Sequence, residues 1–391
     1  MIVNSRHLFL IVSLVALTAT AHGQVRQRES SWDQEWLRKI RNGQPNADFK
    51  IDTLHQFERN KGFSEGLAYV VVKGKWGFIN RAGDIIIKPQ FDDAGCFRNG
   101  LAPVERNGKW GYIDRNGKLV VDFVWDWGFE FYEERALVML AGRWGYIDAS
   151  GKEVIKPQFD VAHSFSEGLA LVGLRTERTK AIEHYDWGYV DRTGKWIIKQ
   201  GVDPRYHPAG DFNDGLAHVH ILLGYHSTGD VMVEDGYIDK TGKVVMKPVI
   251  KGQGTDFYEG LAQIRVSAGG EEWYGFLNRN GQVVIEPKFE NAWHFSEGLA
   301  QIAQGKKWGF VDKQGTMIIG PQFDAVRYFA DGLAAFEVNG KWGFIDKSGR
   351  VIINPRFDRA WNYSEGAVLI AVGDQVGYVD KAGNYIWPPS K

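Results

Sequence analysis

The residues with the clearest capacity for chemistry are histidines near the middle of the chain. A single residue separates His218 from His220, so on a β-strand both imidazoles lie on one face, a geometry that zinc and copper sites use. His207 and His184 are near enough in sequence to add a ligand. However, no acidic or cysteine ligand stands at a fixed spacing from the pair. This favours polar residues at a solvated strand end, and we expect no metal and no cofactor.

Several glutamates look like catalytic carboxylates when each is viewed alone. Glu65, Glu167, Glu259 and Glu297 each directly precede a glycine, and all four occupy the same place in a repeated segment. A role in a turn or at a rim therefore fits them better than catalysis. The sequence also lacks G-x-S-x-G, H-E-x-x-H, a P-loop and a Cys–His dyad. We predict that the protein is not an enzyme.

Other side chains suited to binding stand where the sequence is irregular. Arg175 and Arg178 have acidic neighbours, which indicates a solvated, mixed-charge rim or, alternatively, a contact with an anionic partner. Trp125 and Trp127, in the segment VWDWGFEF, indicate either an exposed aromatic patch for a peptide or glycan or additional core. The candidate binding residues are Arg175, Arg178, His184, His220, His226, Trp125 and Trp127.

These residues are carried by a unit that is repeated nine times. Each copy has a Gly-aromatic-aliphatic-Asp/Asn segment, with a Gly three residues beyond the Asp or Asn. The position before the first Gly is occupied by Trp76, Trp110, Trp144, Trp187, Asp235, Tyr274, Trp308, Trp342 and Val376. The spacing is 34 residues except for three consecutive intervals of 43, 48 and 39. The longer intervals predict elongated hairpins in copies four to six.

Each unit is predicted to be a three-stranded antiparallel meander of about 34 residues. Two apolar runs are separated by Asn-Gly or Gly-Lys, residues that accept positive φ and favour a tight hairpin. Segments such as DKSG, residues 346–349, form a second turn in which Gly takes the left-handed conformation. A third strand follows and should stop at a proline such as Pro355. The segment P-x-F-D-x-A-x-x-F then crosses to the next unit.

Both faces of these strands carry apolar residues, so a single unit cannot bury them and neighbouring units must stack. The repeated tryptophan is best explained as part of the packed core, because it recurs in copy after copy. Asp235 breaks this pattern. A carboxylate at a core position must be solvated or paired.

The segments GKWGFINRAGDIIIKPQFDDAGCF and FSEGLA resemble the bacterial WG-repeat family, and the likeness extends from about Phe63 to Trp387. The resemblance implies an all-β tandem repeat array and brings no set of catalytic residues. Two architectures remain open: an open superhelical, solenoid-like array and a β-propeller. We favour the open array, because 34 residues is short for a four-stranded blade and no strand is left over to close a ring.

The ends of the sequence suggest how the chain is processed. A basic start, an apolar run over residues 8–19 and the small residues before Gln24 are typical of a secretory signal peptide cleaved after Gly23. We expect residues 1–23 to be this signal peptide, residues 24–57 an N-terminal segment with a short capping helix, and residues 58–391 the array. Cys96 is the only cysteine, so packing, not an intramolecular disulfide, must stabilise the fold.

Taken together, these features predict a secreted or periplasmic interaction scaffold that binds a protein partner through its lengthened middle loops. The alternative is carbohydrate or cell-wall binding through aromatic side chains, namely Trp125, Trp127, Trp293 and Trp361. The 47 basic and 48 acidic side chains nearly cancel, so no global field favours nucleic acid. We expect no membrane span after cleavage, because the apolar run is too short.

Overall fold

The computed structural model describes residues 62–178, 183–199, 206–208, 210–225, 231–246 and 253–390. The predicted signal peptide (1–23) and the predicted capping helix (within 24–57) lie outside the described residues. Among the described residues, no helix has the length and apolar character needed to cross a membrane.

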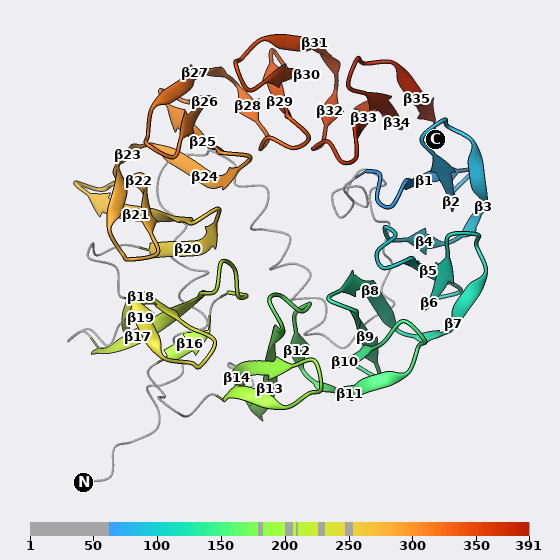
Figure 1. Cartoon of the computed structure of the whole chain (residues 1–391), viewed down its shortest axis with the longest axis horizontal. Coiled ribbons are helices and arrows are strands. Elements are labelled where there is room, and N and C mark those ends of the chain that lie inside the picture. The colour runs from blue at the N-terminus through green and yellow to red at the C-terminus, as the bar shows by residue number, and fades with distance from the viewer. Residues whose placement is uncertain are drawn as a thin grey trace.

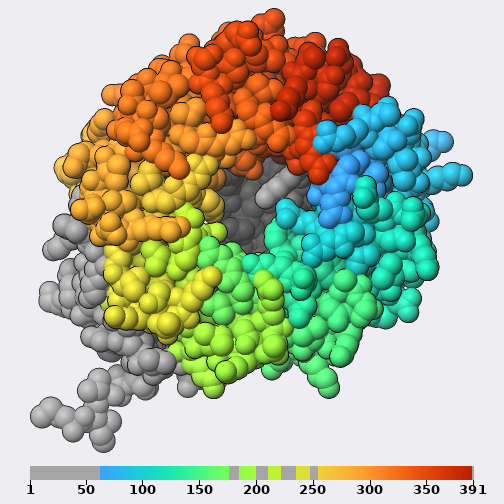
Figure 2. Space-filling view, viewed as in Figure 1, coloured from blue at the N-terminus to red at the C-terminus, as the bar shows by residue number. Residues whose placement is uncertain are grey.

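The described residues form nine antiparallel sheets arranged as blades around a common axis, with the last blade beside the first (Figure 1). The space-filling view shows a ring that is hollowed at its centre (Figure 2). The prediction of an all-β tandem repeat is thus confirmed. Of the two architectures left open, the nine-bladed β-propeller is the observed one, and the preferred open array is not.

Each blade is a continuous stretch of chain, with its strands in sequence order from the axis outward. Blade 1 comprises β1 (Leu67–Val72), β2 (Lys75–Asn80) and β3 (Ile85–Phe91), and blade 2 comprises β4 (Asp93–Ala94), β5 (Leu101–Arg106), β6 (Lys109–Asp114) and β7 (Leu119–Trp125). Blade 3 comprises β8 (Trp127–Tyr132), β9 (Arg135–Leu140), β10 (Arg143–Ile147) and β11 (Glu153–Phe159), and blade 4 comprises β12 (Val161–Ala162), β13 (Leu169–Arg178), β14 (Glu183–Asp191) and β15 (Trp196–Lys199). Blade 5 comprises β16 (Tyr206–Pro208), β17 (Ala217–Tyr225), β18 (Val231–Ile238) and β19 (Val244–Met246), and blade 6 comprises β20 (Gln253–Tyr258), β21 (Leu261–Ala268), β22 (Glu271–Asn278) and β23 (Val283–Phe289). Blade 7 comprises β24 (Asn291–Ser296), β25 (Leu299–Gln304), β26 (Lys307–Asp312) and β27 (Met317–Phe323), and blade 8 comprises β28 (Ala325–Val326), β29 (Leu333–Val338), β30 (Lys341–Asp346) and β31 (Val351–Phe357). Blade 9 comprises β32 (Arg359–Ala360), β33 (Ala367–Val372), β34 (Gln375–Asp380) and β35 (Tyr385–Ser390).

Eight of the nine described blades have four strands rather than the predicted three, and blade 1 has three. The segment P-x-F-D-x-A-x-x-F does cross between blades, but its middle also pairs with the next hairpin as the innermost strand. In blade 9, for example, Arg359 and Ala360 of β32 pair with Ala371 and Ile370 of β33. In blades 2, 4, 8 and 9 this strand has only two residues, too few to produce an alternating apolar pattern, so the sequence gives no sign of it in those copies.

The two predicted turns are confirmed by backbone geometry. In blade 8, Asn339 and Gly340 both have positive φ (53° and 73°), as the two-residue hairpin between β29 and β30 requires. In the second turn, Gly349 has φ 84° and its N–H donates to the Asp346 carbonyl at 2.9 Å. The Asp346 carboxylate also accepts the N–H of Ser348 at 3.0 Å, which fixes the turn.

The third strand does not stop at its proline, contrary to the prediction. In blade 8, β31 continues through Pro355 to Phe357, and its pairing with β30 shifts between Phe344–Ile353 and Trp342–Phe357. Pro355 therefore lies in a β-bulge on the outermost strand, which has no further neighbour in its sheet. A residue without an N–H is tolerated there because no ladder hydrogen bond is lost.

The cores lie between neighbouring blades, where the repeated tryptophans pack. Trp76, Trp110 and Trp144 are buried, whereas Trp187, Trp308 and Trp342 are half-buried. Trp110 belongs to a buried cluster that joins blade 2 to Phe131 and Val138 of blade 3. The stacking of units inferred from two-sided apolar strands is therefore stacking around a ring.

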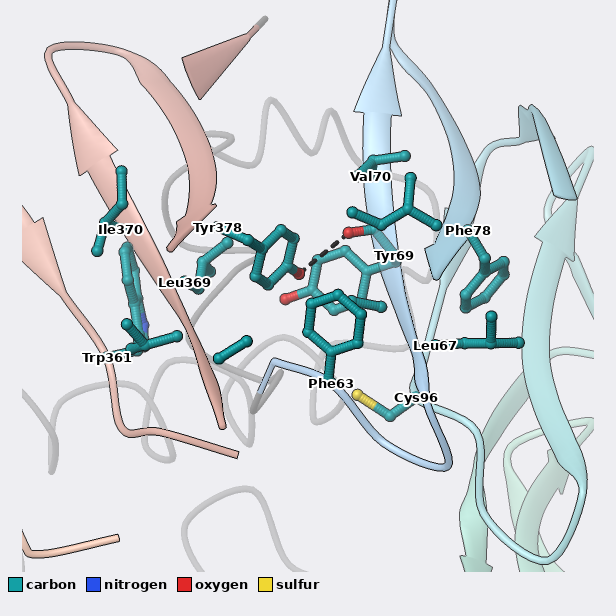
Figure 3. Packing of buried hydrophobic residues seen from close by; sticks show 14 of the residues in the cluster. Phe63, Leu67, Tyr69, Val70, Phe78, Cys96, Trp361, Leu369, Ile370 and Tyr378 are labelled. Carbon is teal, nitrogen blue, oxygen red and sulfur yellow. Dashed lines mark hydrogen bonds between the residues drawn. The ribbon is translucent and has the colours of Figure 1, made fainter. Parts of the chain in front are cut away.

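The ring closes by hydrogen bonds between blades 9 and 1, one of which recurs between other blades. The Tyr378 hydroxyl of blade 9 donates to the Tyr69 carbonyl of blade 1 at 3.0 Å (Figure 3), and Ser364 Oγ donates to the Phe63 carbonyl at 2.7 Å. The equivalent contact between blades 1 and 2 joins Ser64 Oγ to the Phe97 carbonyl at 2.6 Å. No shared strand is needed, because the repeat carries its own means of joining neighbours.

The glutamates before glycine also join blades. Glu365 accepts the N–H groups of Glu65 and Gly66 at 2.8 and 2.9 Å, and Glu65 in turn accepts the N–H of Gly100 at 2.9 Å. The same contact recurs in the pairs Glu133–Gly168, Glu167–Gly215, Asp214–Gly260, Glu259–Gly298, Glu297–Gly332 and Asp331–Gly366. These carboxylates are structural acceptors at blade junctions.

Candidate functional site

One blade junction differs chemically from the others. In blade 5, Asp235 of β18 occupies the position of the repeated tryptophan, and its partner across the hairpin is His220 of β17. His218 lies two residues earlier on the same face of β17. The sequence therefore replaces a packed tryptophan with a carboxylate beside two imidazoles.

The three side chains converge on a single atom. His220 Nδ1 lies 2.8 Å and His218 Nε2 lies 3.2 Å from the same oxygen, Asp235 Oδ1. The second carboxylate oxygen accepts a hydrogen bond from the N–H of Gly254 in blade 6 at 2.5 Å. We name His218, His220 and Asp235 the His–Asp cluster. Its ligand atoms all lie within 4.8 Å of one another, so these residues are suited to holding a metal ion.

The His–Asp cluster is largely removed from solvent. Asp235 and His218 are 2% and 7% exposed, while the side chain of His220 is 29% exposed. Burial alone would raise the pKa of Asp235, but charge interactions with the two histidines and the hydrogen bond with His220 outweigh it and hold that pKa below its ordinary value. The expectation that Asp235 must be solvated or paired is met by pairing.

More titratable groups adjoin the cluster across blades 4 to 6. Asp256 of β20 lies against the backbone of Gly210 in blade 5 and interacts electrostatically with His218. Asp211, next to Gly210, is held by His163 of blade 4, whose Nδ1 lies 3.0 Å from Asp211 Oδ1. Burial raises the pKa of Asp256 to about 6, with Asp211 adding to the rise and His218 and His163 opposing it.

The raised pKa of Asp256 predicts that the free energy of unfolding depends on pH. The folded protein keeps this proton between pH 3.8 and about 6, whereas the unfolded chain releases it, so stability falls as pH rises through that window. Asp256→Asn has no such proton. Measured in chelator by chemical denaturation, its free energy of unfolding relative to wild type should increase by about 2 kcal/mol from pH 4 to pH 7.

A second aspartate supplies the control for that measurement. The pKa of Asp358 is lowered by the N–H of Gly373 and by Lys341. Asp358→Asn should therefore lose stability relative to wild type as pH rises, the opposite sign. A free-energy difference for Asp256→Asn that does not change with pH would contradict the assignment.

The structure brings together only part of the predicted site. His218 and His220 meet, and the backbone of His207 pairs with that of His220, but the side chains of His207, His184 and Arg178 lie outside the described residues, as does all of His226. Arg175 lies within its own blade, where its N–H donates to Asp160 at 2.7 Å and its guanidinium lies over the Tyr185 ring.

The predicted aromatic patch is not an exposed surface. Trp125 is 3% exposed and lies in the core between blades 2 and 3, which corrects its assignment as a binding residue. Trp127 is half-buried, with its ring 5.4 Å from that of Trp110. Of the other two tryptophans invoked for carbohydrate binding, Trp361 is buried and Trp293 is exposed. Trp125 and Trp361 therefore serve as core residues, whereas Trp293 faces solvent.

Asp235 was missed as the acidic member of the cluster. The prediction sought a ligand at a fixed sequence spacing, whereas Asp235 is joined to His220 through the hairpin ladder. A signal was present: in blade 1 the residue opposite Trp76 is Val71, which stands three places after Ala68 of the Gly-Leu-Ala segment. Applying that register to copy five, despite its long hairpin, would have placed His220 opposite Asp235.

The class of protein follows from the fold and this site: it is a nine-bladed β-propeller in which blade 5 carries a carboxylate beside two histidines at the position of the repeated tryptophan. The family model described as "WG containing repeat" matches residues 53–76, 76–110, 110–144, 144–174, 187–219, 236–267, 274–308, 308–342 and 342–374. The chain belongs to this WG-repeat family.

Comparisons beyond the family give only distant likenesses. No curated protein sequence matches the chain. Among solved structures, BamB from Moraxella catarrhalis is 13% identical over 83% of this chain and 94% of its own, with a TM-score of 0.33. The β-propeller domain of the Trilobed protease from Pyrococcus furiosus is 9% identical over 68% and 95%, with a TM-score of 0.36. Dipeptidyl peptidase 4 from Porphyromonas gingivalis is 10% identical over 90% and 61%, with a TM-score of 0.43. At these values, function must be argued from the residues of this chain.

Proposed function

We propose that the protein is a secreted or periplasmic interaction scaffold that docks a protein partner on one face of blades 4 to 6 and performs no catalysis. The observation that carries this proposal is the set of three lengthened hairpins on adjacent blades. β13 and β14 have 10 and 9 residues, β17 and β18 have 9 and 8, and β21 and β22 have 8 each. The corresponding strands of blade 8, β29 and β30, have 6 each.

The three hairpins extend the same side of the ring. All blades share one strand order, so the turn between the second and third strands lies at the same end of each blade. At about 3.3 Å per residue, two to four additional residues extend a hairpin by roughly 7–13 Å beyond its neighbours. A nearly symmetric ring thereby gains one distinct sector, and an asymmetric sector can bind one partner in one orientation.

The tip of the blade 6 hairpin is polar, with Ser267, Glu271 and Glu272 exposed. In blade 6, Arg265 and Glu272 form an ion pair at 3.0 Å across the hairpin, and the turn residues Gly269 and Gly270 have open space where a side chain would project. A polar surface with mixed charge is typical of an interface that forms between folded proteins, and not of one buried permanently. The predicted signal sequence supports placing the partner in the envelope or the exterior.

The test compares trimmed hairpins with a matched control. In the trimmed protein, residues 174–186, 221–234 and 266–273 are each replaced by the sequence of residues 304–307, the short turn of blade 7. This design leaves His218, His220 and Asp235 in place. The control replaces residues 338–341 of blade 8 by the same four residues and changes no length.

Each protein is used as bait in envelope extract, with chemical crosslinking and quantitative mass spectrometry. We expect a partner crosslinked to blades 4 to 6 of the wild type and of the control, and depleted at least tenfold with the trimmed bait. If the trimmed bait captures that partner equally well, the lengthened hairpins are not the docking site. Matching melting temperatures would show that trimming left the ring folded.

A further inference from the structure

We propose that the His–Asp cluster at the junction of blades 5 and 6 is a binding site for a first-row divalent transition-metal ion, with His218, His220 and Asp235 as its protein ligands. Two imidazole nitrogens and one carboxylate oxygen form a donor set that suits Zn²⁺ and similar ions, whereas Ca²⁺ and Mg²⁺ prefer oxygen alone. The site lies on β17 and β18 outside the residues trimmed above, and it does not depend on the proposed partner.

The first observation is convergence. His218 Nε2 and His220 Nδ1 approach the same oxygen of Asp235, from 3.2 and 2.8 Å. Neighbouring ligand atoms in a tetrahedral zinc site lie at comparable separations, since each is about 2.0–2.2 Å from the ion. Small side-chain shifts would therefore place an ion between the three atoms without moving the strands.

The second observation is a nitrogen with an unmet requirement. His218 is 7% exposed, and its Nε2 has no hydrogen bond of acceptable geometry, although it lies near Asp235 Oδ1. A buried polar atom without a partner costs stability unless something else satisfies it. An ion bound at the cluster would use the lone pair of this nitrogen.

The third observation concerns the support around the ligands. The N–H of Gly254 holds Asp235 Oδ2, so the carboxylate is oriented with Oδ1 toward the imidazoles. The His218 ring packs 5.6 Å from that of Tyr237, whose hydroxyl donates to the Thr255 carbonyl at 2.7 Å. Such outer contacts preorient ligands in metal sites. The carboxylate of Asp256 adds a nearby negative charge, and the partly exposed His220 leaves a route for entry.

The fourth observation is the departure from the repeat at the tryptophan position. Six copies place tryptophan where Asp235 stands, whereas the position opposite is variable and carries Val71, Glu105, Met139, Gly173, Ala303 and Glu337 in those copies. Blade 5 gives up the tryptophan and places a histidine opposite the carboxylate that replaces it. A simple loss of tryptophan would not require a histidine opposite the carboxylate.

The experiment titrates the full chain, purified without a histidine tag and freed of metal by a chelator, with Zn²⁺ in a calorimeter and with Co²⁺ in a visible spectrometer. Four proteins are compared. They are the wild type, Asp235→Asn, the double variant His220→Val with Asp235→Trp, and His163→Ala. The double variant installs the cross-strand pair that Val71 and Trp76 form in blade 1. His163→Ala removes a histidine that also contacts an aspartate but lies outside the cluster.

We expect one equivalent of Zn²⁺ to bind the wild type and His163→Ala and to raise their melting temperatures. Co²⁺ added to the same metal-free proteins should give ligand-field bands that indicate nitrogen ligation, and Zn²⁺ should then abolish these bands. Asp235→Asn should bind at least tenfold more weakly, and the double variant should lose the site. No saturable binding by the wild type, or equal binding by Asp235→Asn, would overturn the proposal. Asp235→Asn decides the outcome if the double variant does not fold, because it keeps the size of the native side chain.

Discussion

Replacing Trp110 with alanine should lower the free energy of unfolding by about 3–5 kcal/mol. The Trp110 ring is 6% exposed and lies in the core between blades 2 and 3, with its centroid 5.4 Å from that of Trp127. Deleting it removes apolar burial and leaves a cavity that the rigid ladders on both sides cannot fill. Because the cavity lies between blades, both blades lose support.

Denaturant titration followed by circular dichroism measures this loss. Trp293→Ala is the matched control: this tryptophan is 41% exposed, so its removal should change the free energy of unfolding by less than about 1 kcal/mol. If Trp110→Ala melts at the wild-type temperature, the repeated tryptophan is not a core residue. A similar loss in both variants would show that the effect does not depend on burial.

Gly343→Ala should also be severely destabilising, by about 4 kcal/mol. Gly343 follows Trp342 in the repeated Trp-Gly pair and lies opposite the β-bulge of β31. A Cβ built there would be 2.7 Å from Pro355 N and 3.0 Å from Asn354 C, and closer still to the Ile353 carbonyl oxygen. These are backbone atoms held by the sheet, so they cannot turn aside as a side chain would.

The control for this steric effect is Gly320→Ala. A methyl group added at Gly320 would project into open space, and the φ of this residue is not positive, so the substitution should be nearly neutral. Gly236→Ala is the intermediate case, since its nearest contact is the flexible end of Ile221. Thermal melts of the three variants should rank Gly343→Ala as the least stable. Equal melting temperatures for Gly343→Ala and Gly320→Ala would contradict the role of the bulge.

Much of the blade could be predicted from local chemistry. Asn339-Gly340 selects a tight hairpin, and Asp346 with Gly349 selects the following turn, because these conformations depend on a few neighbouring residues. The outer strand was ended too early at Pro355, since proline is excluded from a ladder but accepted in a bulge at a sheet edge. The inner strand, which has two residues in four of the blades, was missed because its pairing is set by the neighbouring hairpin.

The candidate site divides in the same way. The sequence placed His218 and His220 on one face and required a partner for Asp235, and these features follow from strand periodicity and the cost of a buried charge. It did not join the two findings, because their contact depends on hairpin register across a lengthened loop. The hydrogen bond from the Gly254 N–H to Asp235 could not be predicted from the sequence either, because Gly254 belongs to the next blade.

The sequence by itself determined the repeat, the hairpins, the apolar faces and the need for units to stack, because each depends on interactions within about 34 residues. Only the tertiary structure decided that the stack closes. Closure depends on the small rotation between successive blades, summed over the whole array until Tyr378 reaches Tyr69. No single unit encodes that sum, and the same unit could build an open array if each step turned slightly less.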